Sequence, residues 1–280
     1  MSRVGIINPG AMGISIAASA RAAGHDVYWS SAGRSEATRQ RAEEQHLIAV
    51  DTLNELSGNC DVIICVCPPH AAQSVAEAVI DAGFRGLYCD GNAIAPQKAQ
   101  AIGARLATAG IDFVDGSIIG PPAWKAGATR FYLSGSSAEQ IADLFNNTVT
   151  EAIVIGDEIG KASALKMAFA ALTKGSTALL SAIYGTADQL GVRDDLEREW
   201  AMRDSDSVAQ RRNQVRNVTE KAWRFAGEMQ EIAATFESAG MPPGFFVAAH
   251  DVYERMAQFK DADSAPELED VLAALRDNCD

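Results

Sequence analysis

A glycine-rich turn stands between the first apolar run of the chain and its first helical segment. The run VGIIN is followed by PGAMG and then by ISIAASARAAG. A turn of this kind places backbone N–H groups and a helix N-terminus against the diphosphate of a dinucleotide. Its position between strand and helix favours that interpretation over a plain tight turn. The residues expected to contact the cofactor are Asn8, Pro9, Gly10, Ala11, Met12 and Gly13.

The turn departs from the GxGxxG pattern at its first position, where Asn8 replaces glycine. Asparagine tolerates the left-handed backbone conformation better than most residues. Gly10 stands where the backbone must approach phosphate closely, and Gly13 stands where the helix packs on the strand. The departure is therefore compatible with dinucleotide binding.

The end of the second predicted strand indicates which dinucleotide is bound. The sequence there is VYWSSAGRSEATRQR, with Ser30 and Ser31 at the strand end and Arg34 just beyond. No carboxylate stands at the strand end to hold the ribose 2′-hydroxyl of NAD. Hydroxyls and a guanidinium suit a 2′-phosphate, so we predict NADP rather than NAD. Arg34 as a merely solvated loop residue is the alternative.

Short apolar runs alternate with alanine-rich helical segments over the first 156 residues, and strand signals then cease. This alternation predicts an α/β fold with a doubly wound, mostly parallel sheet of the Rossmann type, followed by an all-helical region. The first helix of that region is expected from about residue 159 to 187. We therefore predict an NADP-binding domain over residues 1–157 and an all-helical domain over residues 158–280.

The composition narrows the classes of partner. The 280 residues carry a net charge of −13 and are 48% hydrophobic. An acidic surface disfavours nucleic acid and anionic membranes. We find no apolar run long enough to span a bilayer and no signal-peptide layout at the N-terminus. The five cysteines form no CxxC pair and the four histidines have no metal-ligand spacing, so we expect reduced thiols, no metal and a cytoplasmic location.

The stretch GKASALKMAFAALTKG, residues 160–175, predicts a helix that is apolar almost all the way round, with Lys166 in its middle. Such a helix is expected to be buried, and an unpaired buried ammonium is costly. Lys166 is therefore either a lysine that extends its charge to solvent or a functional group in a cleft. Lys174 lies about 80° round the helix and could border the same cleft.

These motifs together resemble the β-hydroxyacid dehydrogenase family, which includes 6-phosphogluconate and 3-hydroxyisobutyrate dehydrogenases. NPGAMG is similar to the family's glycine loop, CDGNAIAP to its DxST segment, DGSIIGPP to its DAPVSGG segment, and the helix from Gly160 to its GxGxxxKxxxN motif. AWRFAGEMQEIAATFESAGMP resembles the C-terminal domain of the 6-phosphogluconate dehydrogenase branch. The resemblance covers nearly the whole chain and implies a homodimer formed through the helical domain.

The resemblance also implies roles for individual residues. Lys166 is expected to be the general acid/base, with Asn92 beside the nicotinamide or the substrate hydroxyl. Ile119 stands where the family has a substrate-binding serine, Pro121 replaces a glycine, and Ala170 replaces an asparagine. The familiar small hydroxyacids are therefore not expected as substrates. The remaining candidates are Cys67, Pro68 and His70 beside the cofactor, and Ser117, Gly120, Lys174 and Glu228 beside the substrate.

We therefore predict an NADP-dependent oxidoreductase that transfers hydride between nicotinamide and a hydroxy acid or a related alcohol or ketone. An imine reductase is one alternative, although such relatives commonly have Asp or Tyr where Lys166 stands. A non-catalytic NADP-binding sensor or interaction protein is another, because the family's Ser and Asn are missing.

Overall fold

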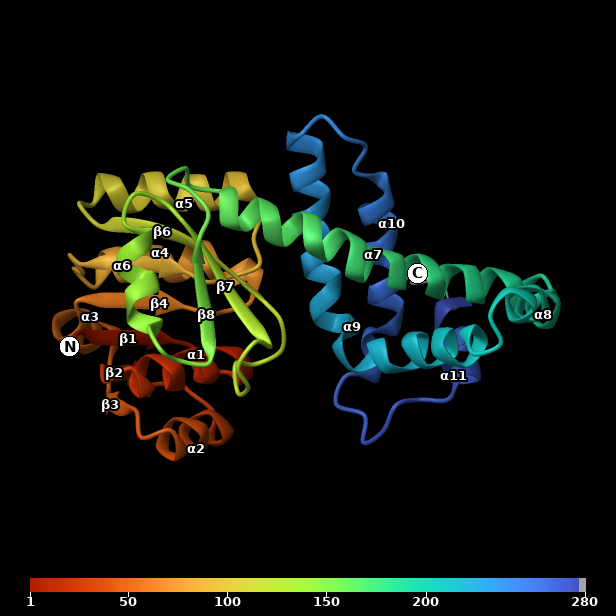
Figure 1. Cartoon of the computed structure of the whole chain (residues 1–280), viewed down its shortest axis with the longest axis horizontal. Helices are drawn as coiled ribbons and strands as arrows, with labels where there is room; N and C mark the ends of the chain where they lie inside the picture. The colour runs from red at the N-terminus through yellow and green to blue at the C-terminus, as the bar shows by residue number, and fades with distance from the viewer. Residues whose placement is uncertain (277–280) are drawn as a thin grey trace. The chain divides into compact units, whose positions relative to one another are not determined.

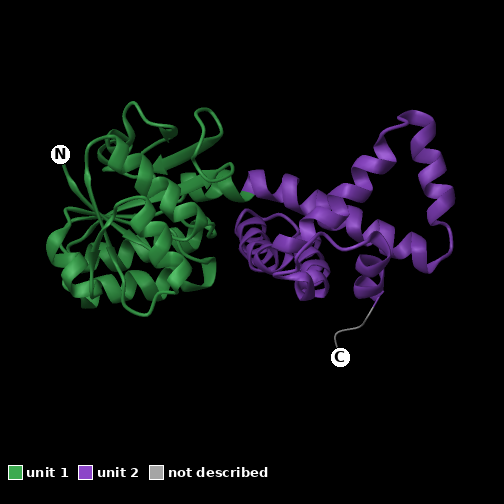
Figure 2. Cartoon of the chain, turned by 90° about the horizontal axis from the view of Figure 1, so that it is seen from below, with its two compact units in different colours: residues 1–167 green, residues 168–280 purple. Residues whose placement is uncertain are grey.

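The computed structural model describes residues 1–276 and divides the chain into two compact units. The units are Met1–Met167 and Ala168–Asp280 (Figure 2). The division falls within the long helix α7 (Lys161–Gln189), which the sequence predicts within two residues at each end.

The first unit is built on an eight-stranded sheet with the order β3-β2-β1-β4-β5-β6-β7-β8 (Figure 1). Every neighbouring pair of strands is parallel except β6 and β7. This mostly parallel sheet confirms the predicted fold class. The strands are β1 (Arg3–Ile7), β2 (Asp26–Ser30), β3 (Ile48–Val50), β4 (Val62–Cys65), β5 (Leu87–Asp90), β6 (Asp112–Ile119), β7 (Thr129–Ser134) and β8 (Thr150–Val154).

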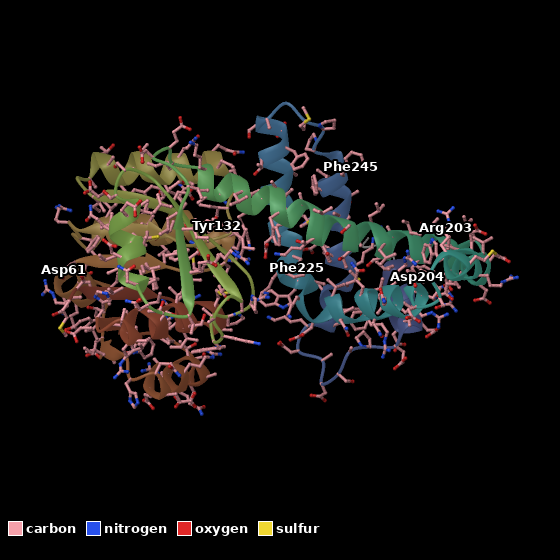
Figure 3. All side chains as sticks on the ribbon, viewed as in Figure 1. Asp61, Tyr132, Arg203, Asp204, Phe225 and Phe245 are labelled. Carbon is pink, nitrogen blue, oxygen red and sulfur yellow. The ribbon has the colours of Figure 1, made fainter. Side chains whose placement is uncertain are left out.

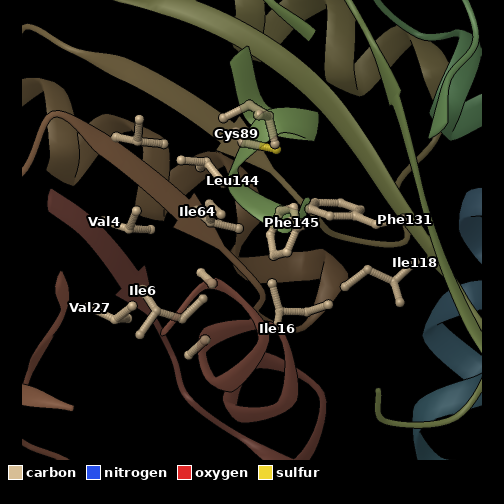
Figure 4. Packing of buried hydrophobic residues seen from close by; sticks show 14 of the residues in the cluster. Val4, Ile6, Ile16, Val27, Ile64, Cys89, Ile118, Phe131, Leu144 and Phe145 are labelled. Carbon is tan, nitrogen blue, oxygen red and sulfur yellow. The ribbon is translucent and has the colours of Figure 1, made fainter. Parts of the chain in front are cut away.

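The central strands are rich in apolar residues because helices cover both faces of a parallel sheet. One core contains Ile6, Ile64 and Phe131, which pack against Ile16 of α1 (Figure 4). The other core contains Tyr88 and Phe113 together with residues of α3, α4 and α5. The helical segments of this unit are α1 (Ala11–Ala22), α2 (Glu36–Glu44), α3 (Leu53–Asn59), η1 (Pro69–Ala71), α4 (Ala72–Asp81), α5 (Pro96–Thr108), α6 (Ala138–Ala142) and η2 (Asp143–Phe145).

The last residues of β4 and β5, and the residues level with them on β6 and β7, form a row of polar side chains across the sheet. Cys65, Asp90, Asp115 and Ser134 occupy paired positions on four neighbouring strands, and all four are buried. Residues paired in this way point to the same face of a sheet. The strand register therefore gathers a row of buried polar groups where ligands bind in open α/β sheets.

The second unit is helical, as the sequence predicts for this part of the chain. Its helices after α7 are α8 (Arg193–Arg203), α9 (Ser207–Ser238), α10 (Gly244–Met256), η3 (Ala257–Phe259) and α11 (Leu268–Arg276). Val215, Met229, Tyr253 and Val271 are fully buried and form part of its core. Among residues 1–276, no helix combines the length and the apolar character needed to cross a membrane.

Candidate active site

The glycine loop joins β1 to α1, and its geometry explains its sequence. Asn8 has a φ of 64°, and its Nδ2 donates to the carbonyl oxygen of Val66 at 2.9 Å. A Cβ atom on Gly13 would lie 2.5 Å from the carbonyl oxygen of Asn8, so no larger residue fits there. Gly10 is the N-cap of α1, and as a glycine it has no side chain to cap the N–H groups that follow it. Unsatisfied N–H groups at a helix start suit an anion.

The neighbouring residues of this loop lie at different depths. Pro9 is buried, Met12 is half-buried and Ala11 is exposed. The structure therefore brings all six predicted loop residues to one turn at the carboxyl end of β1, with only part of the turn open to solvent.

A cavity of about 190 Å³ lies beside this loop at the end of β2. Its lining includes Asn8, Ser30 and Arg34. The Nε atom of Arg34 is buried and has no hydrogen-bond partner among the described residues. Ser31 is buried, and its carbonyl oxygen accepts from the Nη2 of Arg39 at 2.9 Å, which fixes the loop. The cavity thus contains a guanidinium with an unused donor, next to a serine and the glycine loop.

Asn92 connects the ends of β4 and β5. Its Oδ1 accepts from the backbone N–H of Cys67 at 2.5 Å, and its Nδ2 donates to Asp90 at 3.0 Å. Asp90 also accepts from the backbone N–H of Asn92 at 2.9 Å. Both functional groups of the Asn92 side chain are therefore used to hold the loop after β4. In that loop Cys67 is half-buried, whereas Pro68 and His70 are exposed.

The carboxyl group of Asp90 has an unusual acidity. Its pKa is raised to about 7, chiefly by burial and to a smaller extent by Asp115, although the two hydrogen bonds from Asn92 and the charge of Lys98 lower it. A buried carboxyl group with two donors close by titrates near neutrality because desolvation outweighs those bonds.

The end of β6 carries the segment that resembles a substrate loop. Ile119 and Ser117 are buried, and the Oγ of Ser117 has no hydrogen-bond partner among the described residues. Gly120 has a φ of 127°, and a Cβ atom there would lie 2.3 Å from the carbonyl oxygen of Ala128. The carbonyl oxygen of Pro121 accepts from Thr129 at 2.6 Å. Ser117 is therefore an unused hydroxyl beside a turn that requires glycine.

Lys166 lies near this segment. Its Nζ donates to the carbonyl oxygen of Ile118 at 2.7 Å, and the side chain is only partly buried. The bond holds the ammonium near the carboxyl end of β6. The glycine loop follows the carboxyl end of β1 in the same sheet. From the sequence, Lys166 is predicted either to extend its charge to solvent or to act as a functional group in a cleft. Neither prediction includes a hydrogen bond to the backbone of β6.

Lys174 and Glu228 belong to the second unit, where they form an ion pair. The Nζ of Lys174 also lies 4.2 Å from the centre of the Phe225 ring. Phe225 is on α9 (Figure 3). Burial lowers the pKa of Lys174, and Glu228 opposes that shift. The sequence predicts both residues as substrate contacts, but their charges are directed at each other.

Asp115, Ser134 and Ser163 are buried, join β6 and β7 to the start of α7, and are not among the site residues predicted from the sequence. Asp115 accepts hydrogen bonds from Ser134 and Ser163, and from backbone N–H groups of α7 and of Gly160 before it. In the sequence, Asp115 begins the stretch DGS after a run of apolar residues. The family resemblance identifies this stretch only as the start of the substrate segment. Among residues 1–276, no cluster of three or more potential ligands could hold a metal ion.

Residues 3–156 match the model for the NAD-binding domain of 6-phosphogluconate dehydrogenase. This chain belongs to that family. The resemblance to the β-hydroxyacid dehydrogenases is thereby confirmed, and the first unit is a nicotinamide-dinucleotide-binding domain. Residues 187–256 match a separate model, which describes a domain of unknown function.

One relative is similar to this chain over part of the length of both proteins. It is an uncharacterized 28.5 kDa protein of Methanothermus fervidus, 30% identical over 164 residues. The match spans 59% of this chain and 62% of the relative.

Several solved structures share the fold over nearly the whole chain. One is a conserved protein of unknown function whose structure revealed similarity with 3-hydroxyacid dehydrogenases (25% identity, TM-score 0.67, 98% of this chain and 99% of that one). Another is a 3-hydroxyisobutyrate dehydrogenase of Mycobacterium tuberculosis with L-serine (16% identity, TM-score 0.70, 99% of this chain and 100% of that one). An imine reductase of Bacillus cereus is more distant in structure (16% identity, TM-score 0.54, 99% of this chain and 100% of that one).

Proposed function

We propose that this protein is an NADP-dependent oxidoreductase that transfers hydride between nicotinamide and a hydroxy acid or a related alcohol or ketone. The observation that carries the proposal is the position of Lys166. Its ammonium donates to the carbonyl oxygen of Ile118 near the carboxyl end of β6. The glycine loop follows the carboxyl end of β1, which runs parallel to β6 in the same sheet. The oxidation of an alcohol requires a dinucleotide site and a group that carries the hydroxyl proton, and both lie at the carboxyl ends of the parallel strands.

The preference for NADP rests on the cavity beside the glycine loop. Arg34 has a buried Nε without a partner among the described residues, and a 2′-phosphate would supply the missing acceptor. Ser30 lines the same cavity and offers a hydroxyl donor. An arginine fork binds phosphate more strongly than it binds a neutral hydroxyl, because the hydrogen bond is charge-assisted. The residues present therefore fit NADP better than NAD.

Lys166 supplies the proton transfer. A nicotinamide dinucleotide held by the glycine loop and Arg34 would supply the hydride acceptor, C4 of its nicotinamide, for the carbinol carbon of the substrate. As the hydroxyl loses its proton, the amine of Lys166 accepts it, and in the reverse direction the ammonium donates one to the ketone oxygen. The carbonyl oxygen of Ile118 keeps Nζ at a fixed place while the proton moves.

The lining of the β6 end favours a substrate that differs from the familiar small hydroxyacids. Ile119 is apolar where the family has a serine, and Pro121 has no N–H to donate. We propose that the unpartnered hydroxyl of Ser117 and the backbone around Gly120 contact the substrate instead. Asn92 acts by holding the loop of Cys67, because both of its polar groups are already bonded.

We also propose a homodimer. Five residues of α7 and one just after it have apolar side chains that are exposed at intervals of three, four or seven residues, as in a coiled-coil seam. They are Leu165, Phe169, Leu172, Leu179, Ile183 and Leu190, the last of which directly follows the helix, and we name them the α7 stripe. A second copy of the chain would cover it with an identical stripe, since most homo-oligomers have two-fold symmetry.

The experiment is a screen of hydroxyacids, diols, ketones and imines with NADP(H) and NAD(H), followed by the absorbance of the reduced cofactor. The proposal expects turnover with a hydroxy acid, alcohol or ketone and a higher kcat/KM with NADP(H). Turnover with imines alone would assign an imine reductase. Tight NADPH binding with no turnover across the panel would support a non-catalytic sensor.

A further inference from the structure

The carboxylate of Asp115 is the most heavily hydrogen-bonded side chain at the end of the sheet. Asp115 lies on β6, is 1% exposed, and is paired with Asp90 on one side and Ser134 on the other. Its Oδ2 accepts from the N–H of Gly160, the N–H of Ser163 and the Oγ of Ser134, each at 3.0 Å. Its Oδ1 accepts from the Oγ of Ser163 at 2.6 Å. Four donors satisfy this buried charge.

These bonds cap the start of α7 from the sheet. The first N–H groups of a helix have no partner within the helix. Here the N–H of Ser163 and that of Gly160 point to Asp115, and the N–H of Ala162 donates to the Oγ of Ser134 at 3.1 Å. A carboxylate at a helix N-terminus is also favoured by the helix dipole. The cap therefore comes from two neighbouring strands and not from the residue that precedes the helix.

The same strand holds the helix at a second point. Ser163 and Lys166 are three residues apart and lie on one face of α7. Ser163 is bonded to Asp115, and Lys166 is bonded to Ile118, three residues further along β6. Three residues advance about 10 Å along a strand and about 4.5 Å along a helix, and the long side chain of Lys166 spans the remaining distance. Two attachments to one strand fix the helix against sliding or rotating.

We infer that Asp115, acting through Ser163 and the first turn of α7, is the positioning residue that places Lys166 for proton transfer. Asp115 does not touch the reacting atoms, because it is buried and its carboxylate is occupied by donors from the protein. The inference rests on the proposed role of Lys166. A misplacement of about 1 Å can cost about 100-fold in rate, so a loosened first turn lowers turnover without removing any catalytic group.

The test uses Ser163→Ala, with Ser163→Thr as the matched control that keeps the hydroxyl. Ser163→Ala removes one bond to Asp115 and leaves the charge and the backbone bonds in place. Steady-state kinetics with the best substrate from the screen should give a kcat reduced about 10-fold, with KM and the Kd for NADPH within about twofold of wild type. Ser163→Thr should restore kcat to within about twofold.

Two further readouts separate positioning from simple destabilisation. The pH profile of kcat should change in Ser163→Ala and not in Ser163→Thr, because the proton carrier is displaced. Hydrogen exchange of the segment 160–167 should become faster in Ser163→Ala, and faster still in Asp115→Asn if that variant folds. A lower melting temperature with unchanged kcat, pH profile and exchange would overturn the inference.

Lys166→Ala, assayed in parallel, distinguishes failure of the positioning role from failure of the proposed function. Loss of turnover in Lys166→Ala with unaltered kinetics in Ser163→Ala leaves the proposed function standing and overturns the positioning role. Full turnover in Lys166→Ala overturns the proposed function, and the positioning role falls with it.

Discussion

Asn8 and Gly13 approach each other so closely that a Cβ atom on Gly13 would lie 2.5 Å from the carbonyl oxygen of Asn8. The contact holds the first turn of α1 against the end of β1 and leaves the N–H groups of that turn available. The glycine loop therefore depends on the absence of a side chain at a position that is neither exposed nor catalytic.

Gly13→Ala is expected to weaken NADPH binding by at least about 10-fold, because the loop must shift to relieve the contact. Isothermal titration would measure the Kd. Gly58→Ala is the matched control: Gly58 lies in α3 with open space around it, so its replacement should leave the Kd unchanged. Equal affinities for wild type and Gly13→Ala would show that the loop does not hold the cofactor as proposed.

Arg34→Ala is expected to lower the affinity for NADPH by about 10- to 100-fold, which corresponds to the loss of a charge-assisted hydrogen bond. The affinity for NADH should stay within about twofold, since NADH lacks the 2′-phosphate. Arg21→Ala, at an exposed position at the end of α1, serves as the control for loss of positive charge. A parallel loss of affinity for both cofactors would contradict the assignment of Arg34 to the 2′-phosphate.

The buried carboxyl of Asp90 should make stability depend on pH. Burial raises its pKa to about 7 in the folded protein, whereas an unfolded Asp titrates near 3.9. The folded state therefore holds an additional proton between about pH 4 and pH 7. The free energy of unfolding should fall as pH rises through this window, by at most about 1.4 kcal/mol per pH unit from this group.

Asp90→Asn cannot titrate at this position, so its free energy of unfolding should depend less steeply on pH between about pH 4 and pH 7. Urea unfolding of both proteins at a series of pH values measures the difference between the two slopes. Identical slopes would mean that Asp90 is ionised throughout the window.

The α7 stripe should control the oligomeric state. Leu172 is 74% exposed and Leu179 is 61% exposed, so lysine at both positions would leave a folded monomer largely undisturbed. In a dimer the same double substitution would bury charges without partners. Light scattering after size exclusion should give twice the mass of one chain for wild type and the mass of one chain for Leu172→Lys/Leu179→Lys.

Thr173→Lys is the control for the dimer, because Thr173 is exposed on α7 and lies outside the stripe. It should remain dimeric. A monomeric wild-type protein at micromolar concentration would contradict the dimer, and a dimeric double variant would contradict the assigned surface.

Local features of this fold could be predicted from the sequence because their causes are local. The glycine loop follows from the backbone conformation of Asn8 and the close approach at Gly13, both within a few residues. The parallel sheet follows from the alternation of apolar strands with helices. The long helix α7 could be predicted within two residues because its periodicity is sustained over eight turns.

The polar contacts of the candidate residues could not be predicted, because their partners lie far apart in the chain. Asp115 and Ser163 are 48 residues apart, and their bond depends on how α7 starts beside β6. Lys174 and Glu228 are 54 residues apart, and the sequence offers each as a separate substrate contact. Asn92 is expected beside the reacting groups, and its bonds to Cys67 and Asp90 emerge only once β4 and β5 are paired.

The most direct test of the central claim is kcat for the best substrate in wild type, Lys166→Ala and Lys161→Ala. Lys161 is the matched control, since it lies on the first turn of the same helix and is 48% exposed beside Glu158. We expect Lys166→Ala to lose at least about 100-fold in kcat while its Kd for NADPH is unchanged, and Lys161→Ala to resemble wild type. Equal turnover of wild type and Lys166→Ala would contradict the role of Lys166 as the proton carrier.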